Sequence, residues 1–406
     1  MKRLFLALIV PFLFFQCQKP TKSIEGIWHA EVPTVIGPIP FELQIEATDN
    51  GYQTYALNGD EKLLLDSTFL QGDTLHISME LFDAEIVAVV DDTLMKGMYT
   101  KKLGNLEDRS GEFTATKGEK ARFEGGDAST EKTIAEKYAV TFTDDEGGTY
   151  ESVGIFKQNG SKVSGTFLTT TGDYRYLAGN IVEDSLKLSC FDGTHIFLFK
   201  AKIAGDSLVG GKFCASLQYQ ETWEAVKDDN AMLPDATTLT YLKDGYEQIS
   251  FAFPNTKGDT VRLSDERYKN KVVLVQILGS WCPNCMDESK FYAAWLAKNE
   301  DLPVEVIGLA FEKKTDPAYA FPKIDKMKER FGMNYEVLLA GLNSGKDAAA
   351  ALPMLNHVMS FPTTIYIDKA GKVRRIHTGF SGPGTGKYYA DFVEDFDGFV
   401  RKLAGE

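Results

Sequence analysis

Two cysteines three positions apart, Cys282 and Cys285, are the residues whose types and spacing most clearly predict chemistry. They lie in Trp281-Cys282-Pro283-Asn284-Cys285, between an apolar run typical of a buried strand, 272–278, and a segment typical of a helix, 286–298. Helix starts have unpaired backbone N–H groups and a positive dipole end, so we expect the Cys282 thiolate to be favoured. Pro283 suits the first helical turn, where no backbone donor is needed. The pair can therefore cycle between dithiol and disulfide.

Other uses of a CxxC pair fit this sequence less well. A zinc site needs a second ligand pair, and Cys190 and Cys214, which are 24 positions apart, form no further CxxC. A covalently attached haem needs a histidine directly after the second cysteine, where this chain has Met286. A structural disulfide stays open, although it would not need a strand-to-helix junction. We expect redox catalysis, with no metal and no cofactor.

The chain from about Tyr246 to its C-terminus resembles the thioredoxin fold, in its TlpA/ResA-like periplasmic branch. The matching residues are Lys271-Val272-Val273-Leu274-Val275, the CxxC stretch, Glu288, and Phe361-Pro362-Thr363-Thr364-Ile365-Tyr366-Ile367-Asp368. The resemblance implies that Cys282 attacks a partner's disulfide and that Cys285 resolves the mixed disulfide.

The resemblance also implies roles for the neighbours of the cysteines. Pro362 would be a cis-proline facing the CxxC pair, and Phe361 would supply a backbone edge for a substrate strand. Trp281 and Pro283 would shape substrate docking. The sequence alone equally permits a trans proline that starts a strand and a tryptophan that is simply packed in the core.

Glu288 lies three residues after Cys285, on the same helix face. By the resemblance it would move the proton that Cys285 must lose, because a half-buried carboxylate with a raised pKa can do so near neutral pH. The alternative is a solvated surface glutamate. Classical thioredoxins have a buried aspartate six residues before the first cysteine, but this chain has Gln276 there, which leaves more of the proton transfer to Glu288 or to water.

Length and composition limit the function classes. The 406 residues predict two or three domains, and 44 basic against 58 acidic residues give a net charge of −14, which argues against nucleic acid as a partner. The chain has only five cysteines, so disulfides do not build its fold.

The first 17 residues predict a lipoprotein-type export signal. Lys2 and Arg3 precede an apolar run, 4–15, that is too short to span a bilayer, and Cys17 follows as the residue that would be lipidated. Gln16 departs from the small residue usual before such a cysteine, so an ordinary secretory signal is the alternative. We expect an exported protein on the periplasmic face of the cell envelope, anchored by lipid to the outer membrane rather than the inner.

Residues 23 to 227 contain short β-like runs broken by Gly, Asn and Asp, in a pattern that occurs twice. Asp73-Thr74-Leu75-His76-Ile77-Ser78 is matched by Asp184-Ser185-Leu186-Lys187-Leu188-Ser189 at an offset near 110 residues. We infer a duplication, with β repeats at 23–120 and 135–228. Each repeat predicts an antiparallel meander, as a sandwich or partly closed barrel. The segments 123–130 and 228–240 read as linkers.

The meander makes a prediction about two further cysteines. Cys190 and Cys214 would flank the strand that starts near Thr194, so two strand spacings, roughly 9.5 Å, separate them. A disulfide needs Cα atoms within about 7 Å. We therefore expect two free, buried thiols.

The third domain, 241–406, predicts strands alternating with helices, including a helix over 348–357, and so an α/β sheet covered on both faces. The expected fold class is thus α+β multidomain, a duplicated all-β region followed by an α/β thioredoxin fold. The expected function is a membrane-tethered disulfide reductase for exported proteins, served by a membrane thiol donor. The alternative is a binding lipoprotein whose β repeats grip a client or ligand and whose thioredoxin domain is a scaffold.

Overall fold

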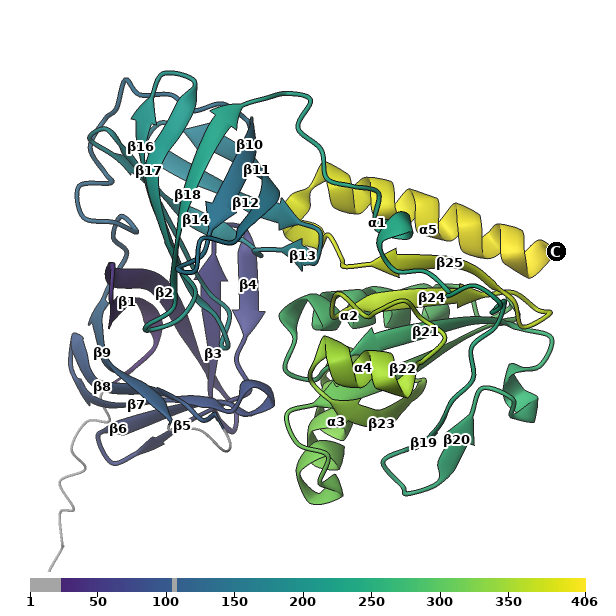
Figure 1. Cartoon of the computed structure of the whole chain (residues 1–406). Helices are drawn as coiled ribbons and strands as arrows, with labels where there is room; N and C mark the ends of the chain where they lie inside the picture. The colour runs from purple at the N-terminus through teal and green to yellow at the C-terminus, as the bar shows by residue number, and fades with distance from the viewer. Residues whose placement is uncertain (1–22, 104–107) are drawn as a thin grey trace, which may run out of the picture.

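The computed structural model describes residues 23–103 and 108–406 (Figure 1). The expected export signal and Cys17 lie outside the described residues. Two β-barrels come first in the chain, and a mixed α/β domain follows them.

The first barrel is an antiparallel sheet that closes on itself. Its sheet order is β2-β1-β9-β8-β7-β6-β5-β3-β4, and pairing between β2 and β3 joins the ends into a ring of eight strands with β4 outside it. The elements are β1 (Gly26–Thr34), β2 (Gly37–Thr48), β3 (Gly51–Asn58), β4 (Glu61–Leu64), β5 (Ser67–Gln71), β6 (Thr74–Met79), the 3-10 turn η1 (Glu80–Phe82), β7 (Ala84–Asp91), β8 (Leu94–Lys101) and β9 (Arg109–Lys117).

The second barrel repeats this topology strand for strand. Its order is β11-β10-β18-β17-β16-β15-β14-β12-β13, closed by pairing between β11 and β12, with β13 in the place of β4. The elements are β10 (Lys137–Thr143), β11 (Thr149–Asn159), β12 (Lys162–Thr169), β13 (Gly172–Asp173), β14 (Leu177–Val182), β15 (Ser185–Phe191), β16 (Ile196–Ala204), β17 (Ser207–Cys214) and β18 (Gln220–Lys227). The shared order supports the inferred duplication, and the closed rings replace the sandwich alternative.

Aromatic side chains fill the second barrel. Phe142 packs against the rings of Phe167, Phe199 and Trp223, all buried, because every second residue of each strand points inward. These rings belong to one buried cluster inside the eight strands, so the interior of this barrel is a packed core.

The two cysteines of the second barrel lie as predicted. Cys190 pairs with Phe197 and Cys214 with Leu198, so β16 separates them, and both thiols are free and buried. The meander geometry therefore accounts for their failure to form a disulfide.

The α/β domain is built on a five-stranded sheet in the order β23-β22-β21-β24-β25. Its elements are α1 (Ala236–Leu239), β19 (Ala252–Pro254), β20 (Thr260–Arg262), η2 (Glu266–Tyr268), β21 (Val272–Leu278), α2 (Pro283–Lys298), β22 (Val304–Glu312), α3 (Pro317–Phe331), β23 (Glu336–Leu342), α4 (Gly345–Ala351), β24 (Thr363–Ile367), β25 (Val373–Thr378), η3 (Pro383–Thr385) and α5 (Lys387–Gly405). The central strands β21 and β22 are parallel, whereas β24 and β25 run antiparallel. Every residue of β21 is buried, because both sheet faces are covered.

One predicted helix is shorter than expected. The prediction over 348–357 extends too far, since α4 ends at Ala351 and Leu352 is its C-cap. Pro353 explains the stop, because a proline disfavours helical backbone in the residue before it.

The barrels are attached to each other and to the α/β domain by polar contacts that are buried or half-buried. Between the barrels, the Arg122 guanidinium binds the Glu42 carboxylate and donates to the Ser189 hydroxyl at 2.8 Å. From the first barrel, Asp83 accepts from Lys313 at 3.0 Å and from Lys323 at 2.6 Å. The predicted linker after β9 therefore begins inside the interface between the barrels.

Candidate active site

The CxxC pair lies where the central strand β21 passes into helix α2. Cys282 is the N-cap of α2, and its Sγ accepts the backbone N–H of Cys285 at 3.2 Å. Pro283 occupies the first turn, and both thiols are free. Cys282 is 5% exposed and Cys285 is 0% exposed, so Cys282 is the sulfur that a partner reaches first. A sulfur at this position can accept helix N–H groups as its negative charge develops.

Cys285 is held as a thiol. Burial, followed by the neighbouring Cys282 sulfur, raises the pKa of the Cys285 thiol well above its ordinary value. A buried thiol without its own charge partner must lose its proton to a nearby base before it can attack a mixed disulfide.

The peptide bond between Phe361 and Pro362 is cis and faces the pair, as the resemblance implied. The Cys282 thiol donates to the Phe361 carbonyl oxygen at 3.4 Å. Trp281 packs edge-on against the Phe361 ring at 5.6 Å between centroids, and its Nε1 donates to the Phe311 carbonyl at 2.8 Å. Trp281 therefore ties the loop before Cys282 to β22 and to the loop that precedes β24.

Glu288 is fully buried inside a polar network, which excludes the alternative of a solvated surface residue. Its Oε1 accepts hydroxyl hydrogens from Tyr292 at 3.0 Å and Thr364 at 3.1 Å, and its Oε2 accepts the amide N–H of Gln276 at 2.8 Å. Burial raises the pKa of Glu288 to about 7, although these three donors act to lower it. The carboxyl group can thus gain and lose a proton near neutral pH.

Gln276 organises that network from the central strand. Its neighbours Leu274 and Leu278 point to the same face of the sheet, which is the face that α2 covers. Its side-chain oxygen accepts from the Ser289 and Tyr335 hydroxyls, both at 3.2 Å. Gln276 takes no proton itself, and it holds the carboxylate that can.

A second buried carboxylate, Glu312, was missed by the sequence analysis. It ends β22 and accepts from the backbone N–H of Ser280 at 2.8 Å and from the Ser280 hydroxyl at 2.7 Å. Burial raises the pKa of this carboxyl group. The available signal was an acidic residue at the end of the apolar run 304–311, next to the expected edge of the active site. Its contacts fix the backbone two residues before Cys282.

The second barrel covers the site. Residues of the second barrel and of the α/β domain together line a cavity of about 290 Å³ beside Cys282. At its rim, Asn284 of α2 donates to the Asp173 carbonyl at 3.2 Å, and the Ser360 hydroxyl donates to the Thr171 carbonyl at 2.6 Å. The turn between β12 and β13 therefore lies beside the Cys282 cavity and the cis-proline.

Arg175 joins all three units. Its guanidinium binds the Asp287 carboxylate of α2, and it donates to Glu61 of the first barrel at 2.7 Å. A third carboxylate, Asp192, lies 4.0 Å away in the second barrel. The Arg175 side chain is only 4% exposed, so these carboxylates compensate a charge that is removed from water.

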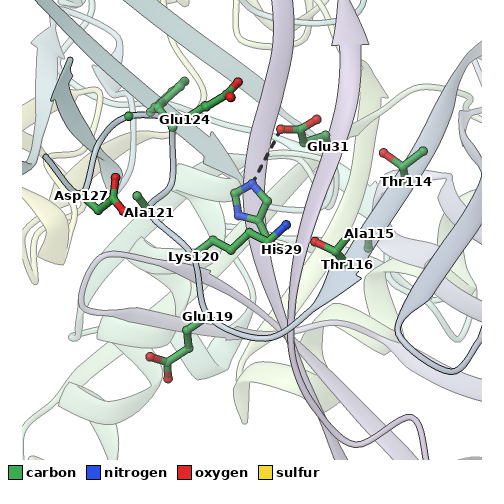
Figure 2. A pocket seen from close by; sticks show the side chains of 12 residues that line it. His29, Glu31, Thr114, Ala115, Thr116, Glu119, Lys120, Ala121, Glu124 and Asp127 are labelled. Carbon is green, nitrogen blue, oxygen red and sulfur yellow. Dashed lines mark ion pairs between the residues drawn. The ribbon is translucent and has the colours of Figure 1, made fainter. Parts of the chain in front are cut away.

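A separate cavity of about 570 Å³ lies on the first barrel (Figure 2). Figure 2 shows His29 and Glu31 side by side in β1, with Nε2 of the histidine 3.7 Å from Oε1 of the glutamate. Lys120 and Glu124, in the segment after β9, also line this cavity. Among the predicted site residues that the structure describes, none lines this cavity.

Two further observations concern metal ligands and membrane-spanning helices. In residues 23–103 and 108–406, no group of three or more His, Cys, Asp or Glu side chains is placed to hold a metal ion. Within that same part of the chain, no helix combines the length and apolar character needed to cross a bilayer.

Comparisons with known proteins match mainly the C-terminal part of the chain. Residues 245–376 match the family model described as the AhpC/TSA family. The thiol-disulfide oxidoreductase ResA of Geobacillus thermodenitrificans is 27% identical over 144 residues, which are 35% of this chain and 74% of that protein. ResA of Bacillus subtilis is 26% identical over 138 residues, 34% of this chain and 69% of that protein. The structure of a secreted thiol-disulfide isomerase from Corynebacterium glutamicum covers 44% of this chain and 99% of its own, with 17% identity and a TM-score of 0.31.

The matched residues hold the dithiol, the cis-proline and the buried glutamate that the sequence singled out. Residues 245–376 form an AhpC/TSA-type, thioredoxin-like thiol-disulfide oxidoreductase domain, distantly similar to ResA and preceded by two β-barrels.

Proposed function

We propose that the whole protein is a disulfide reductase for exported proteins and that Cys282 is its attacking sulfur. The observation that carries the proposal is the position of this sulfur at the N-cap of α2, 3.2 Å from the Cys285 amide nitrogen and beside the cis Phe361–Pro362 bond. Backbone N–H groups at the helix terminus can donate to a sulfur so placed, both when it attacks and when it later leaves.

The reaction has two steps. Cys282 attacks a client disulfide, forms a mixed disulfide and releases the first client thiol. Cys285 then attacks Cys282 and releases the second client thiol, while Glu288 takes the Cys285 proton. The pKa of Glu288, about 7, suits this transfer at neutral pH. Trp281, Pro283 and the Phe361 edge receive the client segment.

The location and the electron source belong to the same proposal. The export signal and Cys17 would place the protein on the periplasmic face of the cell envelope, held by a lipid. A membrane thiol carrier would return the oxidised pair to the dithiol. Replacing Cys17 by alanine should move the protein from the membrane fraction to the soluble fraction, and an unchanged distribution would remove the tether from the proposal.

The alternative of a binding lipoprotein places the activity in the barrels. The filled interior of the second barrel weighs against a ligand held inside it. The contacts of the turn at Thr171 and Asp173 with the active-site loops favour a combined role, in which the barrels help to choose the client.

The test is to trap clients on the attacking sulfur. In Cys285→Ala, mixed disulfides on Cys282 should accumulate in the native host, and mass spectrometry should identify the attached proteins. In Cys282→Ser, trapping and insulin-disulfide reduction should both be lost. Equal insulin reduction by Cys282→Ser and the unmodified protein would refute the reductase and favour the alternative.

A further inference from the structure

A histidine from the second barrel shares a cavity with the attacking sulfur. The wall from the α/β domain includes Trp281, Cys282 and Phe361, and the wall from the second barrel includes Tyr174, His195 and Phe197. The second barrel thus adds a titratable side chain, His195, to the site. Among the described residues that line this cavity, those of the thioredoxin-like domain include no histidine.

The orientation of this histidine is fixed by a buried carboxylate. Nδ1 of His195 lies 2.9 Å from Oδ2 of Asp192, and the other Asp192 oxygen accepts the backbone N–H groups of Thr194 at 3.0 Å and His195 at 2.7 Å. Burial acts to raise the pKa of Asp192, but His195 and Arg175 outweigh it and lower that pKa to about 2. The carboxylate makes Nδ1 the N–H donor, which leaves Nε2 as the nitrogen for a molecule in the cavity.

The turn that carries this pair is held from both sides. The His195 ring stacks on Phe197 with 4.6 Å between centroids. From the first barrel, Nζ of Lys101 donates to the carbonyl and the hydroxyl of Thr194, both at 2.7 Å. A positioned imidazole with a buried carboxylate behind it is the arrangement that proteins use to move protons at a reacting centre.

We propose that His195 is a catalytic residue supplied to the thioredoxin-like site by the second barrel, and that its Nε2 protonates the thiolate that leaves when Cys282 attacks. This inference rests on the proposed reductase function. Asp192 is the positioning residue that fixes the tautomer and the direction of the ring.

The Cys282 thiolate forms a bond to one sulfur of the substrate disulfide, and the S–S bond breaks with its electron pair on the second sulfur. That sulfur takes the Nε2 proton of a His195 imidazolium and leaves as a thiol. The neutral imidazole then regains a proton from water. The enzyme dithiol is the reductant, and the substrate disulfide is the oxidant.

The cavity also limits the substrate class. Its volume of about 290 Å³ lies at the small end of ligand pockets, which span roughly 300–1,000 Å³. The Ser360 hydroxyl, which lies beside the cis-proline, already donates a hydrogen bond to the Thr171 carbonyl of the barrel turn. In this arrangement the cavity favours a small alkyl disulfide, or one on an extended segment of a client, over one on a folded protein surface.

The experiment compares two reagents in the full chain, in a Cys285→Ala background that isolates the first step. With 2-hydroxyethyl disulfide the leaving group is a basic alkyl thiolate, whereas with S-methyl methanethiosulfonate it is a sulfinate that needs no proton. Mass spectrometry follows the modification of Cys282. His195→Gln should slow the alkyl disulfide about 100-fold, the lower range for a lost general acid, and leave the thiosulfonate rate unchanged. The control is His76→Gln, because the His76 ring stacks on Phe69 in the first barrel. This substitution should change neither rate.

Each other outcome overturns the inference. If His195→Gln slows both reagents equally, the residue has only a structural role. If it slows neither, it has no part in the first step. The unchanged thiosulfonate rate also serves as the folding control. Failure of the underlying reductase function would be separate, because Cys282→Ser would then retain insulin reduction whatever the histidine does. A folded disulfide protein reduced as fast as its unfolded form would overturn the substrate class.

Discussion

Replacing Glu288 by glutamine tests whether this side chain is the proton acceptor in the proposed reductase reaction. The substitution keeps the volume of the side chain and removes its charge. Its hydrogen bonds can be re-formed, because the Tyr292 and Thr364 hydroxyls still meet an oxygen. The Gln276 amide can flip to accept from the new N–H, while the Ser289 and Tyr335 hydroxyls rotate. We therefore expect a folded protein that differs in one proton.

The size of the expected change in unfolding free energy follows from the raised pKa of Glu288. A rise from 4.5 to about 7 means that the folded protein favours the protonated carboxyl by about 3 kcal/mol. This contribution to stability is fully present below the unfolded pKa and is lost as the pH rises through the folded pKa. Relative to Glu288→Gln, the unmodified protein should therefore lose about 3 kcal/mol of unfolding free energy between about pH 4 and about pH 8.

The kinetic assay follows the second step directly. A mixed disulfide is prepared on Cys282 with a small thiol, and release of that thiol by Cys285 is timed across pH. The unmodified protein should gain rate with an inflection near 7, where Glu288 becomes able to accept a proton. Glu288→Gln should lack that inflection and be about 100-fold slower above it. Below it the two proteins should converge, because both then carry an uncharged side chain.

The control is Glu300→Gln, because Glu300 is an exposed carboxylate after α2. This variant should reproduce the pH–rate profile of the unmodified protein. A rate ratio between the unmodified protein and Glu288→Gln that is constant across pH would refute the reasoning. The glutamate would then act through packing and not through its proton.

Two further substitutions test the contact between the second barrel and the site. Arg175→Ala leaves buried carboxylates unpaired and should lower the unfolding free energy by about 3–5 kcal/mol, measured by urea denaturation; a loss below about 1 kcal/mol would mean that water replaces the guanidinium. Gly172→Ala places a Cβ 2.2 Å from Nδ2 of Asn284 at a φ of +145°, so the turn must move and iodoacetamide should reach Cys282 faster. Gly160→Ala, where no atom lies within 4 Å of the new Cβ, is the control, and equal alkylation rates in the two variants would contradict the covering role.

The dithiol was predictable because its signals are local. A buried strand, two cysteines and a proline in one short stretch determine where Cys282 lies relative to the helix start, with little help from the rest of the chain. The same is true of the duplication, since each barrel is built from sequential hairpins whose turns are marked in the sequence. The free Cys190 and Cys214 followed from strand spacing alone.

The sequence could not predict which units would meet. Arg175 is an isolated basic residue in the second repeat, and its partners Glu61 and Asp287 are more than 100 positions away on either side. Glu312 likewise looks like the polar end of a strand until Ser280 is placed beside it. Contacts of this kind depend on how three units dock, and no short-range pattern of apolar residues or turns encodes that.

The ion pairs between the barrels and the α/β domain indicate that the barrels are fixed against the candidate active site. They do not act as a spacer. Asp83 of the first barrel is bound by lysines next to and within α3, while Asp287 of α2 is bound by an arginine of the second barrel. The strands and helices that carry these ion pairs lie on both sides of the dithiol. A movement that lifts the turn at Thr171 from the Ser360 hydroxyl would strain the Arg175 contacts as well, because both lie on the short stretch after β12. Access to the Cys282 sulfur is therefore coupled to the packing of the barrels, and substitutions at their interfaces should change which disulfides react more than how fast an unhindered one does.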